Sequence, residues 1–60
     1  MKNTFKVENS KIIKLAQKYG ISQSEVVKTY YEVWCRDDDG ALTAKELYDI
    51  TDSILAEENK

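Results

Sequence analysis

Apolar residues recur at helical spacing in three stretches of the chain, and the first stretch runs from residue 12 to residue 19. Ile12, Leu15, Ala16 and Tyr19 stand at i, i+3, i+4 and i+7, which places them in one stripe along a helix. We expect this helix to begin near Asn9 or Ser10. Gly20 then predicts its end, because glycine readily adopts the left-handed conformation of a helix C-cap.

The second stretch opens with a clear start signal. Ser22 and Glu25 have the spacing of a capping box, and Ile21 and Val26 have that of a hydrophobic staple, so a helix is predicted from Ser22. Its apolar residues form two adjacent stripes, which are Val26, Tyr30 and Val33, and Val27, Tyr31 and Trp34. An apolar arc of this width predicts a central helix with neighbours on both sides.

A turn and a third helix are expected after residue 36. Consecutive aspartates and a glycine make the segment from Arg36 to Gly40 a predicted turn. Thr43 with Glu46 repeats the capping box, and Leu42 with Leu47 repeats the staple. The helix that follows is expected to turn three side chains inward and to fray near residue 57. These side chains are Leu47, Ile50 and Ile54.

Before the first helix, the segment from Thr4 to Glu8 alternates polar and apolar residues around Phe5 and Val7. It predicts either a short strand, which would need a partner strand, or two side chains tucked over the helices. The fold class is therefore all-α, with three short helices in a single domain spanning residues 1–60. A chain of 60 residues buries only roughly 60% of its unfolded surface, so we expect a protein partner or a homodimer to add to its core.

The residue inventory argues against catalysis. The chain has no histidine, and Cys35 is its only cysteine, so no nucleophile and base pair can be assembled from the usual residues. An internal disulfide is excluded for the same reason, which favours a cytoplasmic setting. No apolar run reaches the roughly 18 residues of a membrane span, so no membrane association is expected.

Charge is distributed unevenly. Residues 1–36 carry seven basic and three acidic side chains, a net charge of +4, whereas residues 37–60 carry two basic and eight acidic ones, a net charge of −6. This uneven charge is compatible with head-to-tail self-association. It is also compatible with anion binding by residues 1–36 and cation binding by residues 37–60.

The acidic turn resembles the loop of an EF-hand. With Cys35 as loop position 1, the residues at positions 3, 5, 6, 8, 9 and 12 match the family pattern; they are Asp37, Asp39, Gly40, Leu42, Thr43 and Glu46. Apolar residues also match on both flanking helices, over residues 26–55. The resemblance implies calcium ligands from the carboxylates of Asp37, Asp39 and Glu46, from the carbonyl of Ala41, and from a water held by Thr43.

Cys35 departs from the EF-hand pattern, in which position 1 is almost always aspartate. Calcium prefers oxygen ligands to sulfur, so the helix-loop-helix geometry is expected to persist better than the affinity. Calcium is therefore at most a weak ligand in this prediction. The plainer alternative is that the aspartates form a solvated turn and that Glu46 only caps a helix.

Residues 12–31 also resemble the helix-turn-helix of phage repressors, through Leu15, Ala16, Gly20, Ile21, Ser22 and Val26. The resemblance implies DNA contacts from five residues, which are Lys14, Lys18, Gln23, Ser24 and Lys28. A ribbon-helix-helix dimer built on residues 4–8 is a further variant of the DNA-binding hypothesis. The plain alternative is a helical hairpin whose lysines keep it in solution.

The two resemblances require different faces of the second helix to be buried. The double apolar stripe favours EF-hand-like packing, because Val27, Tyr31 and Trp34 would otherwise be left in water. The preferred hypothesis is a small regulatory or adaptor-like module that binds a protein through Tyr30, Tyr31 and Trp34. DNA binding and calcium binding are the alternatives.

Overall fold

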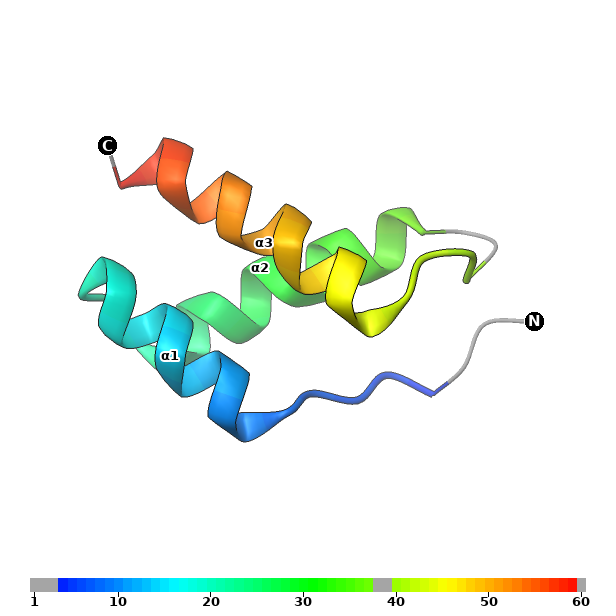
Figure 1. The fold of residues 1–60 in the computed structure, drawn as a ribbon, viewed down its shortest axis with the longest axis horizontal. Coiled ribbons are helices and arrows are strands. Elements are labelled where there is room, and N and C mark those ends of the chain that lie inside the picture. The colour runs from blue at the N-terminus through cyan, green and yellow to red at the C-terminus, as the bar shows by residue number, and fades with distance from the viewer. Residues whose placement is uncertain (1–3, 38–39, 60) are drawn as a thin grey trace.

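In the computed structural model, which describes residues 4–37 and 40–59, the chain forms a bundle of three helices joined by short connections (Figure 1). The helices are α1 (Asn9–Tyr19), α2 (Gln23–Arg36) and α3 (Ala44–Glu58). Helix α2 packs against both of the others, and its contact with α3 is the larger one. The predicted all-α fold and the central place of the second helix are therefore confirmed.

The ends of the helices follow the local signals in the sequence. Gly20 caps α1 in the left-handed region, with φ at 63°, and the Ile21 amide donates to the Ala16 carbonyl at 3.0 Å. The Ser22 side chain caps α2 by accepting from the Glu25 amide at 3.3 Å. Thr43 and Glu46 form a complete capping box at the start of α3.

One apolar cluster connects the three helices, with three buried residues from each: Ile12, Leu15 and Ala16, then Val26, Tyr30 and Val33, then Leu47, Tyr48 and Leu55. Two threonines are buried among them. Each satisfies its hydroxyl within its own helix, Thr51 by donating to the Leu47 carbonyl at 2.8 Å and Thr29 to the Glu25 carbonyl at 3.0 Å. The core therefore contains polar atoms without leaving them unpaired.

The predicted inward face of α3 is partly wrong. Leu47 is buried and Ile54 is half-buried, but Ile50 is 39% exposed. Tyr48, Thr51 and Leu55 are buried instead. Since successive residues are about 100° apart around a helix, an arc centred between Leu47 and Tyr48 includes Thr51 and Leu55 and leaves Ile50 beyond its edge.

The second stripe of α2 also differs from the prediction. Trp34 and Val27 are half-buried at the flank of the buried face, whereas Tyr31 is 48% exposed. Tyr31 is therefore not buried against a neighbouring helix, contrary to the prediction from the double stripe. In its place, Tyr30 stacks on Tyr48, with ring centroids 4.3 Å apart.

The segment before α1 is extended and forms no strand in the described part of the chain. It runs from the start of α1 toward the α2–α3 connection (Figure 1). Phe5 packs against the core, while Val7 is 36% exposed. Of the two predictions for residues 4–8, the tucked segment is therefore confirmed for Phe5 only.

Candidate functional site

Three aromatic rings come together on one face of the molecule, where the N-terminal segment crosses α2. We call Phe5, Tyr31 and Trp34 the aromatic surface. The Phe5 ring lies 5.0 Å from that of Tyr31 and 5.3 Å from that of Trp34, both edge to face, and Tyr31 stacks on Trp34 at 5.9 Å. Edge-to-face and offset contacts at these distances are favourable for aromatic pairs. The surface is therefore an ordered cluster of rings that remains open to solvent at Tyr31.

Tyr30 lies beneath the aromatic surface and was predicted to belong to it. Its side chain is only 2% exposed, so this prediction is wrong for Tyr30, which is a core residue. Burial, with a smaller contribution from Tyr48, raises the pKa of the Tyr30 hydroxyl to about 12. Phe5 was not predicted to be an interface residue. The alternating pattern of residues 4–8 was the one feature of the sequence that indicated its packing on the helices.

Tyr48 joins α3 to the N-terminal segment. Its hydroxyl accepts a hydrogen bond from the Glu8 amide at 2.7 Å, and the Lys11 Nζ lies 5.0 Å from the centre of its ring. The Glu8 carbonyl in turn accepts from the Lys11 and Ile12 amides at the start of α1. Tyr48 therefore fixes the point at which the extended segment becomes a helix.

In the acidic loop, the described carboxylates bind backbone amides. Asp37 accepts from the amides of Ala41 and Leu42 at 3.0 and 3.1 Å. Glu46 accepts from the Thr43 amide at 3.1 Å. These bonds stabilise the turn after Asp37 and the start of α3.

The predicted calcium ligands are only partly placed. Asp39 lies outside the described residues, and within those residues no group of three acidic, cysteine or histidine side chains converges as a metal site would require. Cys35 is exposed. Calcium binding through Asp37, Ala41, Thr43 and Glu46 stays a prediction of the EF-hand resemblance.

Of the residues predicted to contact DNA, Lys18 and Lys28 lie beside carboxylates. Gln23 and Ser24 are exposed at the start of α2. Lys28 lines a shallow hollow with Glu25, Glu32 and Glu58. Lys18 pairs with Asp52 at 3.0 Å. An approaching phosphate group would therefore meet carboxylates beside these lysines, which lowers the expected electrostatic gain.

The Lys18 and Asp52 pair includes the hydroxyl of Tyr19, which also hydrogen-bonds to the Asp52 carboxylate. The hydrogen bond from Tyr19, followed by that from Lys18, lowers the pKa of Asp52. The hydrogen bond to Asp52 raises the pKa of both Lys18 and Tyr19. The Lys18 and Asp52 side chains are 56% and 36% exposed and Tyr19 is half-buried, so the pair positions the end of α1 on α3 with a small expected effect on stability.

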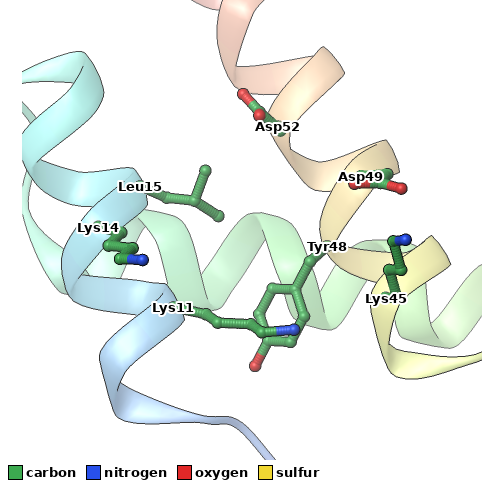
Figure 2. Close-up of a pocket in the computed structure, with 7 residues that line it drawn as sticks. All are labelled: Lys11, Lys14, Leu15, Lys45, Tyr48, Asp49 and Asp52. Atoms are coloured by element: carbon green, nitrogen blue, oxygen red, sulfur yellow. The ribbon is translucent and has the colours of Figure 1, made fainter.

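A hollow of about 280 Å³ lies between α1 and α3 (Figure 2). Lysines from both helices and aspartates from α3 line it around an apolar floor; the residues are Lys11, Lys14, Leu15, Lys45, Tyr48, Asp49 and Asp52. Lys11 and Lys14, from the positively charged residues 1–36, thus line the same hollow as Asp49 and Asp52, from the negatively charged residues 37–60. The predicted head-to-tail attraction is at least partly used inside one molecule.

Comparisons of the chain with protein family models, curated proteins and solved structures found no match. In the described part of the chain, no helix combines the length and apolar character needed to cross a bilayer. The geometry of the aromatic surface and its surroundings is therefore the basis on which a function can be proposed.

Proposed function

We propose that this chain is a small, non-enzymatic module, regulatory or adaptor-like in role, that binds a protein partner through the aromatic surface. The observation that carries the proposal is the convergence of Phe5, Tyr31 and Trp34 from two separate segments onto one face. Aromatic side chains supply much of the binding free energy at protein interfaces because they bury a large area with few rotatable bonds. Tyr31, which is 48% exposed, is the ring most available to a partner.

The residue composition of the chain and the pairing of its charges support protein binding over catalysis or DNA recognition. The chain contains no histidine to act as a base beside Cys35, the one cysteine. Its lysines are interspersed with carboxylates, as the pairing of Lys18 with Asp52 illustrates. A patch of three rings is smaller than the roughly 800 Å² that each partner buries in a typical stable complex. We therefore expect a reversible complex with additional contacts around the rings.

Photo-cross-linking at two exposed positions tests the proposal. The photoreactive residue p-benzoylphenylalanine replaces Tyr31 in one variant and Gln17, an exposed residue of α1, in the other. Each variant is expressed in the cells that produce the protein, irradiated, and analysed by mass spectrometry. We expect a discrete adduct with one protein from position 31 and none from position 17. Equal adduct patterns from both positions, or none from position 31, would contradict the proposal.

A further inference from the structure

The N-terminal segment from Thr4 to Glu8, which we call the strap, runs from the start of α1 toward the α2–α3 connection (Figure 1) and lines two hollows together with residues of α2 and α3. Phe5 attaches the strap to α2 by packing on Tyr30, Tyr31 and Trp34. The Glu8 amide attaches it to α3 by donating to the Tyr48 hydroxyl at 2.7 Å. The strap therefore has one anchor on each of these two helices.

Between its two anchors the strap is held loosely. In the described part of the chain, residues 4–7 take part in no backbone–backbone hydrogen bond. Thr4 and Lys6 are exposed, and Val7 is 36% exposed. A segment with few buried contacts and no backbone pairing belongs to the least stable part of a domain, where local opening is easiest. Removing the Phe5 ring from its site would release most of the strap.

The surface that the strap occupies has the properties of a peptide groove. Two hollows flank the strap, one of about 210 Å³ and one of about 280 Å³, and Tyr30 and Lys6 contribute to both. Trp34, Leu42 and Leu47 give the first hollow an apolar wall, and Asp37 and Lys6 line it with opposite charges. The groove therefore accommodates the extended backbone of the strap, with the aromatic side chain of Phe5 followed directly by the cationic side chain of Lys6.

We propose that the strap occupies the binding site of a protein partner. The groove would then bind an extended segment of that partner in which an aromatic residue is followed by a basic one. This inference rests on the proposed function and specifies its partner. The incoming segment displaces residues 4–8, and its aromatic ring takes the place of Phe5 beside Tyr31 and Trp34, which remain as the protein's part of the aromatic surface. Because a tethered segment has an effective concentration near the millimolar range, the strap weakens binding of a free segment whose Kd is about 0.1 mM by about tenfold.

A second copy of this chain is the less favoured occupant. Exchanging straps between two copies would recreate the same Phe5 and Glu8 contacts and add none, while association would cost translational and rotational freedom. A different protein with the same local chemistry can add contacts at Tyr31 outside the groove, since that ring is 48% exposed.

The test uses a capped peptide, Thr-Phe-Lys-Val-Glu, and a variant with an empty site, Phe5→Ala. Trp34, the only tryptophan, lies against Phe5, so its fluorescence reports occupancy. We expect a saturable change with a Kd of about 0.1 mM for Phe5→Ala, and about tenfold weaker binding to the unaltered protein. The control peptide Thr-Ala-Lys-Val-Glu should give no saturable change, and Thr-Phe-Glu-Val-Glu should bind several-fold more weakly.

Far-UV circular dichroism checks that Phe5→Ala is folded, and Phe5→Leu replaces it if it is not. The absence of saturation up to about 10 mM peptide with a folded variant, or equal binding of the alanine peptide, would overturn the inference. A dimer of the unaltered protein that the peptide dissociates would identify a second copy as the occupant and would also overturn it. A partner that cross-links at position 31 but ignores the peptide would refute the strap inference alone. Peptide binding without such a partner would refute the proposed function alone.

Discussion

The face formed by α1 and α3 and the face formed by α2 and the strap are built from different interactions. Between α1 and α3, Lys18, Tyr19 and Asp52 satisfy one another, and Lys11 lies over the ring of Tyr48. On the other face, Phe5, Tyr31 and Trp34 pack on one another and leave part of Tyr31 in water. Charges that neutralise each other offer little to a partner, whereas an exposed ring gains free energy when it is covered.

Tyr48 is the residue that connects these two faces, and its loss should have the largest effect on stability. Tyr48→Ala removes a buried ring that stacks on Tyr30 and should lower the free energy of unfolding by about 3 kcal/mol. Tyr48→Phe keeps the ring and loses only the hydrogen bond from Glu8, for about 1 kcal/mol. Urea denaturation followed by circular dichroism measures both. Equal losses in the two variants would show that ring packing is not what joins the faces.

Removing the Phe5 ring should have the next largest effect. Phe5 is half-buried, so Phe5→Ala should lower the free energy of unfolding by about 1 kcal/mol and should increase exchange of the Glu8 amide, the strap amide that donates to Tyr48. The helices should keep their exchange protection. Val7→Ala is the matched control, since Val7 belongs to the same segment and is 36% exposed. Loss of protection throughout α2 and α3 would contradict the description of a locally attached strap.

The charged face should show a smaller effect that depends on pH. The pKa of Asp52 is lowered in the folded state, so its contribution to stability is present above the unfolded value near 4 and disappears as pH falls through the lower folded value. Asp52→Asn should therefore cost less than Tyr48→Phe near neutral pH, and its cost should shrink as pH falls below about 4. Melting temperatures measured from about pH 2 to pH 7 provide the test. A difference that grows toward acid pH would contradict this linkage.

The smallest expected effect concerns calcium. If the loop has the EF-hand register, Cys35→Asp supplies the missing carboxylate at position 1 and should strengthen calcium binding, with magnesium acting less. Trp34 fluorescence monitors the titration because this residue immediately precedes position 1. Cys35→Ser is the control, since it adds no carboxylate. Identical titrations of the two variants would count against the register.

Local sequence signals predicted the helix boundaries well because capping depends on neighbouring residues. The Gly20 cap and the Thr43–Glu46 capping box both occur where expected. The orientation of each helix was harder to predict, since it depends on which neighbour is larger. Tyr48 turns toward Tyr30, and Ile50 consequently moves to the edge of the buried arc.

The candidate site was predicted only in part. Tyr31 and Trp34 were identified from their helical spacing, but Tyr30, in the same run, is buried. The role of Phe5 could not be deduced, because an alternating segment of five residues is compatible with a strand or with a tucked loop. Similarly, the pairing of Lys18 with Asp52 joins residues 34 positions apart, and no local pattern indicates it.

The most direct test of the central claim compares one residue from each face in binding to the protein that cross-links at position 31. Isothermal titration with the purified partner should show about tenfold or greater loss of affinity for Tyr31→Ala. Asp52→Asn should bind within about twofold of the unaltered protein, because the charged face lies outside the interface. Unchanged affinity for a folded Tyr31→Ala, or a large loss for Asp52→Asn, would contradict binding through the aromatic surface.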